Sequence, residues 1–143
     1  MSVAIRKTYK FEAAHQLPGH NGKCKNLHGH SYVLEVEIVG DLQTDTEASD
    51  FMMVMDFHDL DAIVKPLIEV ALDHKFLNTT LEEYSPRTTA ECVAIHIAGY
   101  IKQKLPEHIT LTEVVLWETA TSRAIWRHRV TESWHNHTQP QPA

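Results

Sequence analysis

The sequence predicts an α+β fold in which a four-stranded antiparallel sheet carries two helices on one face. Three observations support this: alternating apolar residues in two N-terminal segments, helical apolar spacing in two central segments, and two apolar stretches near the C-terminus. The chain has 143 residues, 43% of them hydrophobic, which suits one compact domain burying roughly 70% of its unfolded surface. We expect one domain over residues 1–130 and a polar tail without stable structure over residues 131–143.

The first two elements are predicted to be strands with one apolar face each. Between residues 3 and 13 the odd-numbered positions are apolar, with Lys7 as the one exception. Between residues 32 and 38 the even-numbered positions are apolar, and Gly40 with Asp41 ends the run. Alternation with a period of two is typical of a strand that is buried on one side.

The next element is predicted to be a helix. Apolar residues from 57 to 71 keep helical spacing, and Asp56 is placed to cap the first turn. Pro66 should kink this helix or divide it in two, because proline has no backbone N–H to donate.

A second helix is expected over residues 89–104, where Thr88 and Glu91 fit a capping box. Two apolar stretches, at residues 111–119 and 123–130, then predict a final pair of strands. Four strands under two helices leave open sheet edges, which proteins cover, blunt or pair with another copy. We therefore expect a homo-oligomer.

Composition and charge exclude several classes of protein. The formal charge of −6 and the pI of about 6.0 argue against a nucleic-acid partner, because binding to the phosphate backbone needs clustered Lys and Arg. No run approaches the ~18 apolar residues of a membrane span, and the N-terminus lacks the apolar core of a signal peptide. With only two cysteines, the composition favours a reducing compartment and a cytoplasmic protein.

Three histidines fall on the apolar faces of the two N-terminal strands. His28 and His30 have the parity of the apolar residues in the second strand, and His15 has that of the first. Three neutral imidazoles with one open position are a common way to hold catalytic Zn²⁺. Fe²⁺, Ni²⁺ and Cu²⁺ also accept imidazole, and zinc is the default expectation.

Other interpretations of the histidines remain open at this level. The chain has 11 histidines, so chance pairings are common, and all three could be ordinary core or turn residues. His20 competes for the place of third ligand. A second His-x-His pair, at His135 and His137, belongs to no amphipathic strand.

Cys24 lies in a polar turn between Lys23 and Lys25. Neighbouring cations or a metal favour the thiolate, which could serve as a base or a nucleophile. Alternatively, Cys24 is a fourth zinc ligand that closes the site, or an incidental exposed cysteine. Cys92 lies among apolar residues of the second helix and is expected to be a packed core residue.

Three further polar residues are candidates for chemistry. Asp73 could orient His74 for proton transfer, although a histidine at the end of a helix also suits the helix dipole. Glu118 interrupts an apolar stretch, where a carboxylate needs a partner. That partner is either a flat ligand edge with two N–H groups or a buried arginine.

Six ordered segments resemble the 6-pyruvoyl-tetrahydropterin synthase family over about residues 3 to 129. They are FEAAH (11–15), C-x-x-x-H-G-H (24–30), MDF (55–57), LDHKFLN (72–78), TTAE (88–91) and WET (117–119). The interval of three residues between Cys24 and His28 is similar to that of the bacterial branch, the 6-carboxy-5,6,7,8-tetrahydropterin synthases of queuosine biosynthesis. At the position of Thr88 the family usually has proline.

The resemblance implies a tunnelling fold (T-fold), in which sheets of neighbouring subunits join into an oligomeric barrel. The barrel is usually a homohexamer with active sites at subunit interfaces. The implied reaction converts the pterin 7,8-dihydroneopterin triphosphate to 6-carboxy-5,6,7,8-tetrahydropterin and releases acetaldehyde and triphosphate. Alternatives are the 6-pyruvoyl reaction, which keeps the side-chain carbons, a zinc-dependent hydrolase, and a non-catalytic zinc module.

The resemblance also implies roles for individual residues. Cys24 matches the proton acceptor, Asp73 and His74 a proton relay, and Glu118 the anchor of the pterin edge. Zinc would be held by His15, His28 and His30, and further pterin contacts would come from Thr89 and Glu91.

Overall fold

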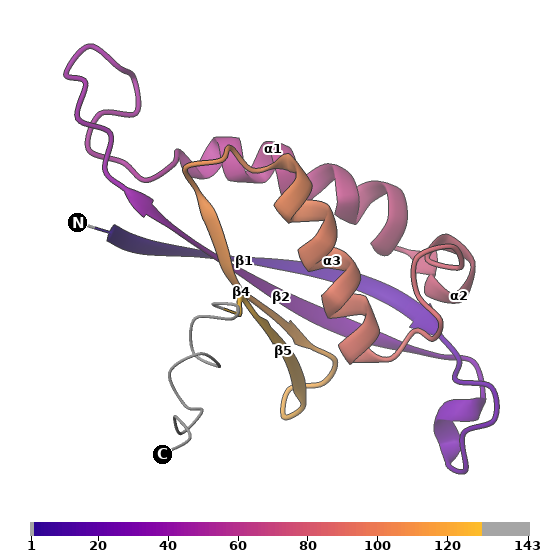
Figure 1. The fold of residues 1–143 in the computed structure, drawn as a ribbon. Helices are drawn as coiled ribbons and strands as arrows, with labels where there is room; N and C mark the ends of the chain where they lie inside the picture. The colour runs from indigo at the N-terminus through magenta and orange to yellow at the C-terminus, as the bar shows by residue number, and fades with distance from the viewer. Residues whose placement is uncertain (1, 130–143) are drawn as a thin grey trace, which may run out of the picture.

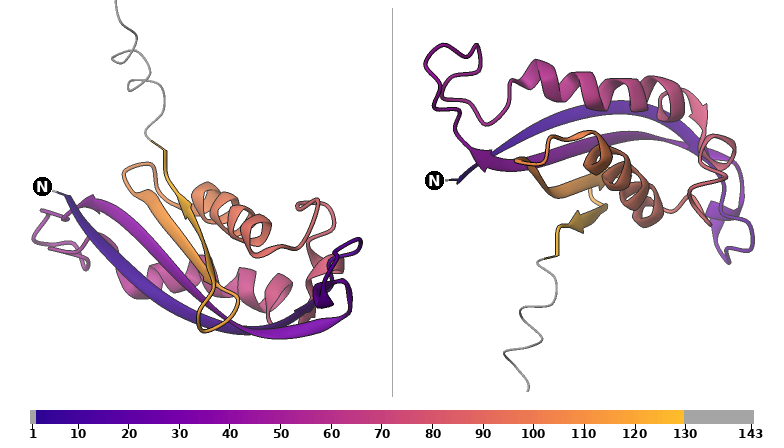
Figure 2. Two further views of the ribbon diagram at one scale, coloured as in Figure 1. Left: turned by 90° about the horizontal axis from the view of Figure 1, so that it is seen from below. Right: turned by 45° about the horizontal axis from the view of Figure 1, so that its top comes forward.

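The computed structural model describes residues 2–129, which form a twisted five-stranded sheet with helices on one side (Figures 1 and 2). The strand order is β3-β1-β2-β4-β5. The strands are β1 (Ser2–His15), β2 (His28–Asp41), β3 (Lys75–Phe76), β4 (Thr110–Trp117) and β5 (Arg123–Arg127). The α+β class and the four long strands are confirmed. The predicted tail and its His-x-His pair lie outside the described residues.

The prediction of four strands was wrong by one. Strand β3 pairs with the end of β1 in parallel, with Ala13 opposite Lys75 and Ala14 opposite Phe76, so the sheet is mixed. The other neighbours are antiparallel. Two residues are too few to show a period of two, which is why the sequence pattern missed this strand.

The helices are α1 (Phe57–Leu67), α2 (Leu77–Thr80) and α3 (Ala90–Lys104), with a 3₁₀ turn at Lys23–Lys25 and a π-helical turn at Ile68–Leu72. Helices α1 and α3 are close to the two predicted positions, whereas the short helix α2 was not predicted. Among the residues with an assigned position, none of these helices has the length and apolar content needed to cross a membrane.

Both predicted caps were tested by the structure. Asp56 caps α1 as expected, since its side chain accepts from the His58 N–H at 2.8 Å. Helix α1 passes through Pro66 and gives way to the π-helical turn one residue later, so the expected division is a change of helix type. The capping box of Thr88 with Glu91 was wrong: Thr89 is the cap, and its hydroxyl accepts from Cys92 N–H at 3.2 Å.

The core lies between the sheet and the helices, which cover one face of the sheet in Figure 2. Lys7, the polar exception in the apolar face of β1, has a partner there. Its Nζ lies 2.6 Å from the carboxylate of Asp61 on α1, and the Tyr9 hydroxyl donates to the same carboxylate at 2.8 Å. Asp61 is only 7% exposed, so these contacts compensate for burying its charge.

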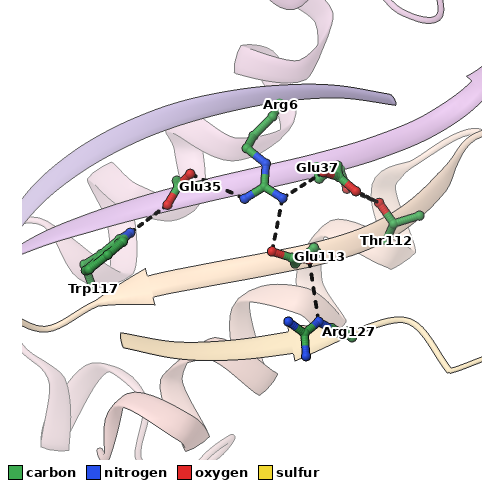
Figure 3. A network of polar contacts seen from close by, with 7 residues as sticks. All are labelled: Arg6, Glu35, Glu37, Thr112, Glu113, Trp117 and Arg127. Atoms are coloured by element: carbon green, nitrogen blue, oxygen red, sulfur yellow. Dashed lines mark hydrogen bonds and ion pairs between the residues drawn. The ribbon is translucent and has the colours of Figure 1, made fainter. Parts of the chain in front are cut away.

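The other side of the sheet carries a network of polar contacts (Figure 3). Arg6 lies 3.4 Å from Glu35, 2.7 Å from Glu37 and 3.1 Å from Glu113. Glu35 also accepts from the Trp117 indole N–H at 2.6 Å. Charged side chains from three strands therefore meet on this face of the sheet.

Candidate functional site

Three histidines meet at one end of the sheet. His15 ends β1 and pairs directly with His28, the first residue of β2, while His30 pairs with Ala13. One ring nitrogen from each histidine lies within 4.8 Å of the other two, so the three form a group that could hold a metal ion. The prediction that strand parity brings these imidazoles together is confirmed.

The hydrogen bonds of His15 and His28 determine which nitrogen of each ring carries the proton. His15 Nδ1 lies 2.7 Å from the Thr88 carbonyl oxygen, and His28 Nδ1 lies 2.7 Å from that of Asn26. A carbonyl oxygen only accepts, so Nδ1 is the donor in both rings and each neutral ring carries a lone pair on Nε2.

Those two Nε2 atoms face each other at 3.0 Å. Two lone pairs at this distance repel each other unless a cation lies between them. Two nitrogens bound to one tetrahedral Zn²⁺ at 2.0–2.1 Å would be roughly 3.3 Å apart. The arrangement is therefore close to that of two metal ligands.

His30 completes the donor set. Among the described residues its Nε2 has no hydrogen-bond partner although it is buried. Burial lowers the pKa of His15 and of His30 below the ordinary 6.5, despite the opposing effect of Glu118, which favours neutral rings that can bind a metal. The residues present fit a zinc ion.

Glu118 lies beside the histidines, at the end of β4. Its Oε1 is 3.5 Å from His15 Nε2 and 3.6 Å from His30 Nε2. No ion pair between Glu118 and an arginine is found among the described residues, so the alternative of a buried arginine partner is not supported. The side chain is 28% exposed, which leaves the carboxylate accessible to a ligand.

Tyr32 is a second buried residue without a polar partner. Its ring stacks on Phe11 with centroids 4.9 Å apart and lies 5.5 Å from the His30 ring. The side chain is 1% exposed, and its hydroxyl has no hydrogen-bond partner within residues 2–129. Burial first, and then the charge of Glu118, raise the pKa of Tyr32, so the hydroxyl keeps its proton.

Cys24 and His20 lie outside the group of three histidines that could hold a metal ion. The carbonyl of Cys24 accepts from Leu17 N–H at 2.8 Å, which ties the 3₁₀ turn to the end of β1. The ring of His20 instead accepts from Gly22 N–H at 2.9 Å. The structure therefore does not support Cys24 as a fourth ligand or His20 as the third.

Asp73 and His74 form a pair anchored on the backbone of Glu12. One oxygen of Asp73 accepts from Glu12 N–H at 2.9 Å, and the other lies 2.9 Å from His74 Nδ1. These contacts, that of Glu12 first, lower the pKa of Asp73. His74 has a φ of 56°, an uncommon conformation for a residue other than glycine, and its N–H donates to the Glu12 carbonyl at 2.6 Å. The His74 ring is thus held in place by an ionised carboxylate.

Two hollows meet at His30. One has a volume of about 560 Å³ and is lined by Trp117, Glu118 and Thr119, among others. The second, of about 450 Å³, is lined by Glu12 and His74. A larger hollow of about 710 Å³ lies between α1 and α3 and includes none of the three clustered histidines. Glu118 and His74 therefore belong to two hollows that share His30.

Thr89 and Glu91 are placed differently from the other candidates. The Thr89 hydroxyl caps α3, and Glu91 is exposed on the first turn of that helix. Neither residue lines the two hollows that share His30. Their contact with a substrate stays a prediction.

Two residues hold the His15 ring in place, Thr88 directly and Asn78 through Thr88, and the sequence did not predict this role for either of them. Thr88 supplies the carbonyl that binds His15, and Asn78 accepts from the Thr88 hydroxyl at 3.2 Å. Asn78 closes the LDHKFLN segment, and its place in that segment was the available signal. The sequence marked Thr88 only as a capping candidate, and nothing local pointed to the contact of its carbonyl with His15, 73 positions away, or to its burial at 3% exposed.

The comparison with protein families agrees with this geometry. The model of the family described as 6-pyruvoyl tetrahydropterin synthase matches residues 4–129. The chain belongs to this family.

Curated and solved relatives support the same assignment. The 6-carboxy-5,6,7,8-tetrahydropterin synthase of Haemophilus influenzae is 40% identical over 136 residues, covering 82% of this chain and 94% of that protein. The synthase of the same name from Synechocystis sp. is 44% identical over 122 residues, covering 84% and 89%. The structure of Caenorhabditis elegans 6-pyruvoyl tetrahydropterin synthase matches with a TM-score of 0.76 at 25% identity, covering 90% and 97%.

Proposed function

We propose that this chain is a zinc-dependent carbon–carbon lyase, a 6-carboxy-5,6,7,8-tetrahydropterin synthase of queuosine biosynthesis. Its substrate would be 7,8-dihydroneopterin triphosphate, and its products 6-carboxy-5,6,7,8-tetrahydropterin, acetaldehyde and triphosphate. The similarity to the Haemophilus and Synechocystis synthases of that name supports this activity. The observation that carries the metal requirement is the pair of Nε2 lone pairs, of His15 and His28, facing each other at 3.0 Å.

His15, His28 and His30 would hold the zinc ion. When bound there, zinc would polarise the oxygen atoms of the substrate side chain and make the proton on the adjoining carbon easier to remove. Imidazoles held by backbone carbonyls need little rearrangement to accept the ion, so the site is largely preformed.

Glu118 would anchor the flat amino-pyrimidinone edge of the pterin. A carboxylate accepts two parallel N–H groups in one plane, and the hollow of about 560 Å³ beside it falls in the usual range for small-molecule sites. Thr89 and Glu91 are proposed as further contacts, on the resemblance alone.

Cys24 and the Asp73–His74 pair would move protons. The Cys24 thiolate would take the proton from the substrate side chain. Asp73 holds a proton on His74 Nδ1, which leaves Nε2 free to exchange a proton with the substrate. Because Glu118 and His74 line hollows on either side of His30, the substrate ring and side chain could lie across that residue.

We further propose that residues 1–130 act as one T-fold catalytic domain in a barrel-shaped homohexamer with active sites at subunit interfaces. The open sheet edges support this, because β3 pairs only with Ala13 and Ala14 of β1, and β5 forms the opposite edge of the sheet. Light scattering of the purified protein at several concentrations tests the assembly, and a monomer at all of them would contradict it.

The test of the activity is a turnover assay with 7,8-dihydroneopterin triphosphate. We expect acetaldehyde and the 6-carboxy product in equal amounts, loss of both after chelation, and recovery with Zn²⁺. Pterin turnover without acetaldehyde would indicate the 6-pyruvoyl reaction instead and reject the proposal. Full turnover after complete removal of metal would reject the zinc requirement.

A further inference from the structure

We infer that Asn78 is a positioning residue for the metal centre, because it holds both chain segments whose contact fixes the His15 ring. The inference rests on the proposed metal-binding function and adds a residue to it. Asn78 lies on α2, and it is not one of the three histidines that would hold the metal.

The first contact joins Asn78 to the residue that follows His15. Asn78 Oδ1 accepts from the Gln16 backbone N–H at 3.0 Å, and Asn78 Nδ2 donates to the Gln16 carbonyl at 2.8 Å. The side-chain amide of Asn78 thus binds both the backbone N–H and the backbone carbonyl of Gln16. This fixes the direction in which β1 ends and, with it, the place of the His15 Cα atom.

The second contact joins Asn78 to the residue that holds the His15 ring. The Thr88 hydroxyl donates to Asn78 Oδ1 at 3.2 Å, while the Thr88 carbonyl accepts from His15 Nδ1 at 2.7 Å. Gln16, Asn78, Thr88 and His15 therefore form a closed ring of covalent and hydrogen bonds. His15 is 0% exposed and Thr88 is 3% exposed, so water does not compete for these groups.

His15 depends on this ring in a way that His28 does not. The carbonyl that binds His28 belongs to Asn26, two residues away, whereas the carbonyl that binds His15 is 73 residues away. A distant carbonyl stays in place only if other contacts hold its segment. The pairing of Phe76 with Ala14 brings α2 to the end of β1, which places Asn78 between the two segments.

The ring of contacts through Asn78 determines the direction in which the lone pair of His15 Nε2 points. With Nδ1 donating to Thr88, His15 presents Nε2 to the ion, and a turn of the ring would misdirect it. Loss of partners that orient metal-bound histidines typically weakens metal binding by about 10- to 100-fold. We expect Asn78→Ala to weaken Zn²⁺ binding by about that factor and to alter the visible absorption of the Co²⁺-loaded protein.

The experiment uses the full chain, with Zn²⁺ affinity measured by competition against a chromophoric chelator and the Co²⁺ spectrum as second readout. Thr79→Ala, an exposed neighbour on α2, is the matched control and should bind like wild type. Thermal unfolding of the metal-free proteins shows whether each variant is folded. A general loss of structure would not move the Co²⁺ bands of the fraction that remains folded.

A second pair of variants tests the same ring if Asn78→Ala does not fold. Thr88→Val removes the hydroxyl that contacts Asn78 but keeps the carbonyl that binds His15, and Thr88→Ser restores the hydroxyl. Thr88→Ser should bind Zn²⁺ more tightly than Thr88→Val. Equal affinity and equal Co²⁺ spectra in both, or in Asn78→Ala and wild type, would overturn the inference while leaving the metal site intact. Absence of metal binding in wild type would instead overturn the proposed function.

Discussion

The carboxylate of Glu118 lies 3.6 Å from Nε2 of His30, closer to the candidate metal centre than an anchor for the far edge of a pterin requires. The same oxygen is 3.5 Å from Nε2 of His15. Glu118 is therefore near enough to interact with an ion as well as with a substrate ring, and the two roles predict different outcomes.

We predict that Glu118→Gln keeps its metal and loses substrate affinity. The amide has the same shape, but one of its two terminal atoms is a donor, so it cannot accept two parallel N–H groups, and kcat/KM should fall by about 10- to 100-fold, mainly through KM. Steady-state kinetics with metal analysis checks this, and Glu107→Gln, at an exposed position remote from the histidines, is the control. Loss of zinc in Glu118→Gln would show that the carboxylate serves as a ligand.

Cys24→Ala should retain one equivalent of zinc, because Cys24 does not belong to the group of three histidines. Turnover should fall by about 100-fold or more, because the proposed proton acceptor is removed. Metal content and single-turnover kinetics of the same sample test both halves of this prediction. Cys92→Ala, on α3, is the matched control. Metal loss would favour a structural zinc module, and full activity with zinc bound would favour a hydrolase.

Tyr32→Phe should leave stability unchanged or raise it by about 1 kcal/mol, because a buried hydroxyl without a partner is removed and the stacking on Phe11 is kept. Urea unfolding of the metal-free protein measures the change. Tyr9→Phe provides the contrast: its hydroxyl donates to Asp61 at 2.8 Å, and its loss should cost about 1 to 3 kcal/mol. A comparable cost in Tyr32→Phe would reveal a partner for that hydroxyl.

Asp61→Asn should destabilise the protein by about 1 to 3 kcal/mol near neutral pH, because the ion pair with Lys7 is lost. Burial tends to raise the pKa of Asp61, but the hydrogen bonds from Lys7 and Tyr9 outweigh it and leave the pKa below the ordinary 3.8.

The ionised carboxylate therefore stabilises the fold above the unfolded-state pKa, and this contribution is lost as the pH falls through the lower folded-state value. The stability difference between wild type and Asp61→Asn should shrink as the pH drops below about 3.8. Urea unfolding over a pH series measures it, and a constant difference would contradict the assignment.

The parts of the fold that repeat a local period could be predicted from the sequence. Alternation in β1 and β2 was enough to place His15, His28 and His30 on one face, because the side-chain direction in a strand depends only on parity. Lys7 broke the pattern for a reason that lies elsewhere in the chain: its partner Asp61 is on α1.

The parts that depend on distant contacts could not be predicted in the same way. Strand β3 is two residues long and α2 is four, so neither shows a period. The contact of Thr88 with His15 involves a backbone carbonyl, which every residue has, and so no residue type marks it. The sequence marked Asn78 only as the last residue of the LDHKFLN segment. Its contacts with Gln16 and Thr88 could not be predicted from the sequence.

The charged network around Arg6 lies on one face of the sheet, and the hydrophobic core covers the other face. A second sheet packed onto the charged face would remove water from the ionised groups, at a cost of several kcal/mol per ion. In the proposed barrel, copies of this chain would therefore pair edge to edge, along the direction of the strand hydrogen bonds, and the charged face would line the space that the barrel encloses.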